Sequence, residues 1–128
     1  MINVVQNKIK NHKDIIEYIE SKPVKWFHRD LQTKLGKSNF YTLYKDNMDQ
    51  ELLDLIFVNL DKKLKIINKF KLHLFTLTTS DTDGLVCEWE NKYYFLPDRA
   101  GQYIDFPLFS WHWVNPVKHK RYSLVVGE

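Results

Sequence analysis

From Lys63 to its end, the chain reads as a succession of short β-strands separated by turn sequences. Short strands with turns at this density favour a sandwich or a jelly roll over a parallel sheet. Tight turns are predicted at residues 80–84, 90–92 and 97–101, where glycine, asparagine and aspartate permit the backbone angles that chain reversals need. The predicted strands, rich in aromatic and β-branched residues, cover residues 63–67, 69–78, 85–90, 92–96, 102–106, 110–115 and 121–126.

The first half of the chain carries two helical patterns. Asn11 can cap a helix over residues 12–20, and Asp46 or Asn47 can cap a second helix that runs to about Leu60. Each helix has an apolar stripe at helical spacing, so each should pack against a sheet. Further strands are predicted at residues 2–5, 24–28 and 39–44, of which the last two should pair antiparallel.

Length and charge restrict the class of protein. A chain of 128 residues is expected to form one domain, with helical and strand support in residues 1–62 and a β core in residues 63–128. The net charge of +3 is spread over interspersed acids and lysines, which argues against a nucleic-acid partner. The start is too polar for a signal peptide, and no apolar run reaches the length of a membrane span. We therefore expect a cytoplasmic protein without a membrane partner.

The last predicted strands combine residue types that suit a metal ion or a carboxylate ligand. Strand alternation places His112 away from the two tryptophans beside it, and places Arg121 and Ser123 together on one face of the final strand. Imidazole is a common iron ligand, and guanidinium pairs bidentately with a carboxylate. If Arg121 is buried, a protein carboxylate such as Asp105 could pair with it instead, and the arginine would then be structural.

The order Gly101, Pro107, His112 and Arg121-x-Ser123 resembles the end of the double-stranded β-helix in the cupin-like Fe(II)- and 2-oxoglutarate-dependent oxygenases. The nearest branches are the aspartyl/asparaginyl β-hydroxylases and the prolyl hydroxylase-like proteins. The resemblance implies an α+β fold in which N-terminal helices pack on a double-stranded β-helix, or jelly roll. It also implies a dioxygenase that uses Fe(II) and 2-oxoglutarate to hydroxylate a small-molecule or protein substrate.

Each matching residue has a role that this resemblance implies. His112 would be the distal iron ligand, while Arg121 and Ser123 would hold the far carboxylate of 2-oxoglutarate. The Lys-Leu-His-Leu run at residues 71–74 resembles the Arg-x-His-Leu strand of the aspartyl/asparaginyl β-hydroxylases. Lys71 and His73 would accordingly help to bind the inner carboxylate, although a lysine cannot make the planar fork of the usual arginine.

The family's first pair of metal ligands, His-x-Asp or His-x-Glu, is not found directly before the Lys71 strand, where only Asp61 stands. His28 and Asp30 have the right spacing and are candidate substitutes for these ligands, but a surface cluster at a strand end explains them as well. Residues 81–84, Asp-Thr-Asp-Gly, resemble a His-Thr-Asp-Gly ligand run without its histidine, but more naturally form a turn. The missing pair favours an alternative reading. In that reading the chain is a catalytically degenerate jelly roll that binds a small carboxylate or a protein partner.

Overall fold

The computed structural model describes residues 2–33, 36–60, 71–107, 109–117 and 119–126. The helical elements in these ranges are α1 (His12–Ser21), the short 3₁₀ helix η1 (Lys45–Asn47) and α2 (Gln50–Phe57). The strands are β1 (Asn3–Val5), β2 (Phe27–Thr33), β3 (Gly36–Thr42), β4 (Lys71–Thr76), β5 (Gly84–Trp89), β6 (Lys92–Pro97), β7 (Tyr103–Pro107), β8 (His112–Val114) and β9 (Ser123–Val126).

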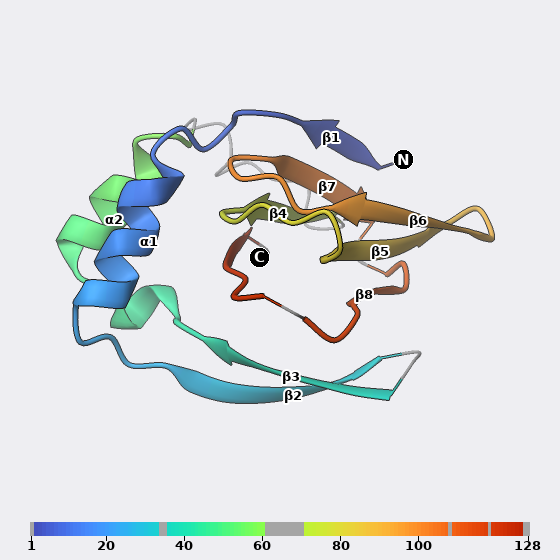
Figure 1. The fold of residues 1–128 in the computed structure, drawn as a ribbon, viewed down its shortest axis with the longest axis horizontal. Helices are drawn as coiled ribbons and strands as arrows, with labels where there is room; N and C mark the ends of the chain where they lie inside the picture. The colour runs from blue at the N-terminus through green and yellow to red at the C-terminus, as the bar shows by residue number, and fades with distance from the viewer. Residues whose placement is uncertain (1, 34–35, 61–70, 108, 118, 127–128) are drawn as a thin grey trace.

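The described strands form three antiparallel sheets (Figure 1). Sheet A has four strands in the order β1-β7-β4-β9, and sheet C has three strands in the order β6-β5-β8. Within the described ranges, β2 and β3 pair only with each other, and we call this hairpin sheet B. Sheet B runs along the lower edge of the view in Figure 1, apart from the other two sheets, whereas α1 and α2 lie together at one end of the molecule.

Sheet A is the middle layer of the molecule, as the two faces of β4 show. Strand alternation sends Phe75 to one face and Leu74 to the other. Phe75 packs against the buried stripes of the helices, which consist of Ile15, Tyr18, Leu52 and Ile56. Leu74 belongs to a second apolar cluster between sheets A and C, with Leu85, Cys87, Ile104 and Phe106.

Both predicted helices are present, but the capping of each differs from the prediction. Asn11 precedes α1 as expected, yet its side chain makes no capping bond and instead donates to the Leu55 carbonyl of α2 at 2.8 Å. The cap of α2 is Asp49, whose carboxylate accepts a hydrogen bond from the Leu52 N–H at 2.9 Å. The predicted cap at residues 46–47 was too early because η1 occupies those positions.

The predicted fold class, α+β with N-terminal helices packed on a double-stranded β-helix, is wrong. The described residues form a mostly β structure whose strands are divided among separate antiparallel sheets. β2 and β3 bond to each other and extend neither of the sheets built from the later strands. The strand predicted at residues 63–67 falls outside the described residues.

Candidate functional site

Three of the predicted site residues face the layer between sheets A and C. Ser123 lies opposite Thr76 in sheet A, on the face that is turned toward sheet C. Arg121 precedes Ser123 by two positions, and its side chain is also largely buried. His112 belongs to β8 of sheet C, and its ring packs against Phe106 with 4.8 Å between the ring centroids. The structure therefore brings these three residues to one side of sheet A.

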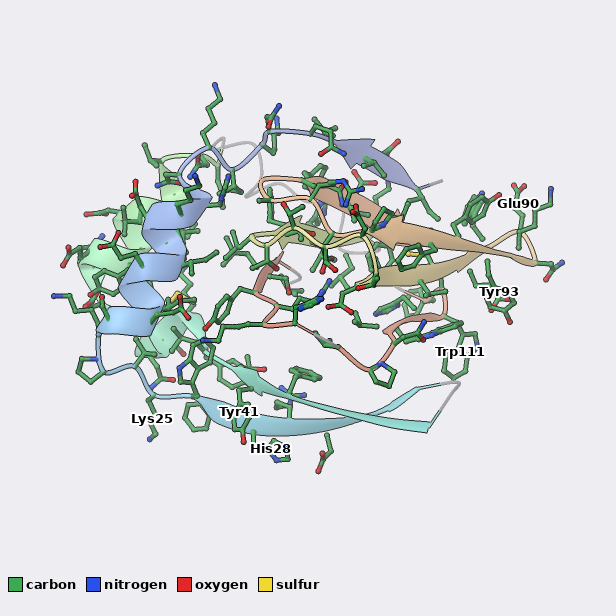
Figure 2. All side chains as sticks on the ribbon, viewed as in Figure 1. Lys25, His28, Tyr41, Glu90, Tyr93 and Trp111 are labelled. Carbon is green, nitrogen blue, oxygen red and sulfur yellow. The ribbon has the colours of Figure 1, made fainter. Side chains whose placement is uncertain are left out.

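The other four predicted residues lie elsewhere. Lys71 and His73 share the face of β4 that carries Phe75, so they are on the side of sheet A opposite to Ser123 and Arg121. His28 and Asp30 are exposed side chains of the β2–β3 hairpin, 3.7 Å apart. Figure 2 shows His28 pointing away from the rest of the molecule. The residues expected to hold one cosubstrate do not form one site.

His112 is held in one tautomer by a backbone carbonyl. Its Nδ1 lies 2.8 Å from the Ser110 carbonyl oxygen, and because a carbonyl can only accept, Nδ1 carries the hydrogen. The Nε2 of the neutral ring then keeps its lone pair, as in histidines that bind metals. Cys87 lies directly opposite in β5, where burial raises the pKa of its thiol to about 12. That thiol is therefore not a ready thiolate ligand.

Arg121 is already paired with a carboxylate of the chain itself. Its Nε donates to Asp98 Oδ2 at 2.7 Å and its Nη2 donates to Asp98 Oδ1 at 3.1 Å, which is bidentate geometry. The two side chains are 13% and 3% exposed. Burial raises the pKa of Asp98, and the hydrogen bonds and charge of Arg121 oppose that rise. The carboxylate that pairs with Arg121 is thus Asp98 and not Asp105, which had been expected in this role.

A second polar cluster lies on the opposite face of sheet A. Asp105 accepts hydrogen bonds from Asn3 Nδ2 at 2.9 Å, from Lys71 Nζ at 3.3 Å and from the Tyr103 hydroxyl at 2.9 Å. Because the tyrosine hydrogen goes to the carboxylate, the Tyr103 oxygen must accept from His73 Nδ1, 2.6 Å away. Lys71 is thus engaged by Asp105, and the buried Nε2 of His73 has no hydrogen-bond partner among the described residues.

The burial of His73 predicts a pH-dependent loss of stability. Burial lowers the pKa of His73 below its ordinary value of 6.5, with Asp105 opposing this shift and Lys71 adding to it. As the pH falls below 6.5, the unfolded chain takes up the proton before the folded chain does, so stability decreases. We therefore expect the free energy of unfolding of the wild type to fall with pH more steeply than that of His73→Gln. The two slopes should differ by at most about 1.4 kcal/mol per pH unit. Urea unfolding of both proteins measures it, and equal slopes would contradict it.

Among the residues that the structure describes, the donor set for iron and 2-oxoglutarate is incomplete. In the described ranges, no group of three or more His, Cys, Asp or Glu side chains is placed to hold a metal ion. The guanidinium expected on the cosubstrate carboxylate is bound to Asp98, and Lys71 and His73 face the other side of sheet A.

An exposed edge strand is the feature that sequence reasoning missed. β6 is the outer strand of sheet C and pairs, among the described strands, with β5 alone. Tyr93, Tyr94 and Phe95 are all exposed, Phe95 over 47% of its surface. Lys92 and Pro97 stand at the two ends of the strand, as is usual in edge strands, but no charge interrupts residues 93–96 between them. The available signal was the Tyr-Tyr-Phe-Leu run, which lacks the alternation of a strand with one solvated face.

The turn before β6 determines which of its backbone groups point outward. Glu90 and Asn91 have φ values of 51° and 63°, which is the type I′ combination of a two-residue hairpin. In such a hairpin the pair that flanks the turn is hydrogen-bonded, and such pairs recur at every second residue. Tyr94 and Leu96 therefore bond to β5, and the N–H and C=O of Phe95 point to the open side. Figure 2 shows Glu90 at the tip of this hairpin.

Searches of protein-family models, curated proteins and solved structures found no match to this chain. The kinship with the oxygenases accordingly stays a prediction from motif order. Among the described residues, no helix is both long enough and apolar enough to cross a membrane. The function has to be argued from the residues themselves.

Proposed function

We propose that this protein is a binding module that takes up an extended protein segment as an additional strand along β6. The observation that carries the proposal is the open edge of sheet C, where exposed aromatic side chains lie in a run, residues 93–96, that no charge interrupts. Backbone groups at an open edge are a template for another strand, and this mode of recognition recurs in peptide-binding domains. An extended backbone is the partner that such groups recognise.

The side chains of β6 add apolar contact to the backbone bonds. Tyr93 and Phe95 share one face of the strand, and they are 56% and 47% exposed. Trp113 in β8 lies on the same face of sheet C, with its ring 5.7 Å from that of Tyr93. Aromatic side chains bury a large area on contact and are enriched at interfaces. A partner strand would thus meet backbone groups at its edge and aromatic rings on one face.

The inter-sheet residues favour binding over catalysis. Arg121 is already paired with the carboxylate of Asp98. The residues predicted to hold one cosubstrate lie on opposite faces of sheet A. A site for 2-oxoglutarate would have to displace Asp98, which is buried and bidentate. Breaking such a pair leaves an uncompensated charge, a cost of about 3–5 kcal/mol that ligand binding would have to offset.

A designed peptide tests this function. The probe is an acetylated, amidated peptide of alternating threonine and valine with a lysine at each end, which forms an extended strand. Followed by amide NMR, its addition should shift the Phe95 amide and its neighbours in β6. A copy of the peptide that is N-methylated at every residue should cause no shift, because neither of its edges then has the backbone donors that pair with β6.

A matched pair of variants separates backbone from side-chain recognition. Phe95→Pro removes the outward N–H and should abolish binding, and proline is tolerated where the N–H of an edge strand faces solvent. Phe95→Ala keeps that N–H and should weaken binding by about two- to fivefold, the usual value of one cross-strand pair. Equal binding by wild type and Phe95→Pro would show that β6 is not the docking edge.

A second candidate function is the Fe(II)- and 2-oxoglutarate-dependent dioxygenase that the motif order implies. The observation that favours it is His112, whose Nδ1 is fixed by the Ser110 carbonyl and whose Nε2 keeps a lone pair on the inter-sheet side. Its test is the conversion of 2-oxoglutarate to succinate by the purified protein with Fe(II). Succinate formation that His112→Ala abolishes would favour the dioxygenase over the binding module.

A further inference from the structure

We propose that the segment that docks on β6 is β6 of a second copy of this chain. The two copies would then share one continuous sheet with three strands from each sheet C. This inference rests on the proposed function, because it assigns the occupant of the same edge. Three features of β6 select a second copy: its hydrogen-bond pattern, its side-chain pattern and the charges at its two ends.

The hydrogen-bond pattern of β6 is self-complementary. A two-fold axis perpendicular to the sheet at Phe95 places this residue opposite its own copy, with the strands antiparallel. Because the N–H and C=O of Phe95 both point to the open side, the two copies of this residue exchange both hydrogen bonds. Pro97, which has no N–H, ends the ladder and limits its length. The outward donors and acceptors of one copy thus match those of the other.

The side chains match under the same axis. The two Phe95 rings become directly opposed cross-strand neighbours on one face of the joint sheet. On the other face, Tyr94 of each copy lies opposite Leu96 of the second copy. Each aromatic pair of this kind adds stability beyond backbone bonding, and residues 93–96 bring no charge that would repel an identical strand.

The charges at the ends of β6 are complementary between copies. In this register, the hairpin turn of one copy lies beside the loop that follows Pro97 in the other. The turn carries Glu90, and the loop carries Arg99, which forms an exposed 3.0 Å ion pair with Asp81. Glu90 of each copy is then a neighbour of Arg99 of the second copy, and Lys92 lies near that copy's Asp81. Opposite charges at both ends favour this antiparallel register over other pairings.

The experiment is sedimentation equilibrium of the full chain over a range of concentrations. Wild type should approach twice the chain mass of 15.5 kDa. Phe95→Pro should sediment as a monomer, because it loses both central hydrogen bonds. Glu90→Arg should raise the dissociation constant about tenfold at low salt and less at high salt, since it places like charges together. Tyr41→Ala removes an aromatic residue of sheet B that is more exposed than Phe95, and this variant should stay dimeric.

The outcomes distinguish this inference from the proposed function. The wild-type protein could stay monomeric up to about 0.1 mM and still bind the threonine-valine peptide. That result would rule out a second copy of the chain as the partner of β6 and leave the binding function intact. A monomer that also fails to bind the peptide would remove both. A dimer that persists in Phe95→Pro would place the contact on another surface and would overturn the inference. An unchanged amide spectrum outside β6 verifies that Phe95→Pro is folded.

Discussion

Replacing Arg121 with methionine is expected to lower the free energy of unfolding by about 3–5 kcal/mol. The physical reason is Asp98, whose side chain is 3% exposed and receives two hydrogen bonds from this guanidinium. Without Arg121 the carboxylate would have to remain charged and buried without its bidentate partner, or take up a proton. Urea unfolding at about pH 7 measures the loss.

The double variant Arg121→Met with Asp98→Leu is the control. Removing both charges leaves apolar groups of similar volume, so most of the lost stability should return. The double-mutant cycle should give a coupling energy of at least about 1.5 kcal/mol, because the two side chains touch. If Arg121→Met were as stable as wild type and instead lost affinity for 2-oxoglutarate, Arg121 would be a ligand-binding residue and our account of it would be wrong.

Replacement by alanine should affect stability and partner binding differently at Phe75 and at Phe95. Phe75 is fully buried between sheet A and the helices, so Phe75→Ala should cost about 3–5 kcal/mol of stability. Phe95 is half exposed on β6, so Phe95→Ala should cost less than about 1 kcal/mol and weaken partner binding. Thermal unfolding together with peptide titration of both variants separates the two roles.

A large stability loss in Phe95→Ala would contradict this distinction. It would mean that the ring at position 95 packs within the fold and is not available to a partner. Phe75→Ala provides the scale for that comparison, because both substitutions remove the same atoms from the same residue type. The difference between them then reports burial alone.

Local sequence patterns predicted most of the elements and little of their assembly. The helix from His12 and the turns around residues 90–92 and 97–101 agree with the structure, because helical spacing and turn chemistry act over a few residues. The antiparallel pairing of β2 with β3 also followed from the sequence, but residues 29–33 and 36–38, which were expected to form the connecting loop, belong to the strands. The division of the strands into separate sheets did not, because it depends on contacts between segments that are far apart in the chain.

The candidate site shows the same limit. The sequence indicated that a buried Arg121 would need an anion and offered Asp105, but the partner is Asp98, 23 positions away, and only the sheet register brings it there. Likewise, nothing local shows that His73 and His112 face opposite sides of sheet A. The edge position of β6 depends on the whole strand order, so the Tyr-Tyr-Phe-Leu run alone did not establish that Phe95 is exposed.

Amide hydrogen exchange in β6 tests the central claim most directly. In the monomer, at low protein concentration, the Phe95 amide should exchange rapidly, whereas the amides of Tyr94 and Leu96, which bond to β5, should be protected. Adding the threonine-valine peptide should slow exchange at Phe95 and leave its two neighbours unchanged. If Phe95 is as protected as Tyr94 and Leu96 in the isolated monomer, the edge of β6 is already closed and the proposed mode of binding is wrong.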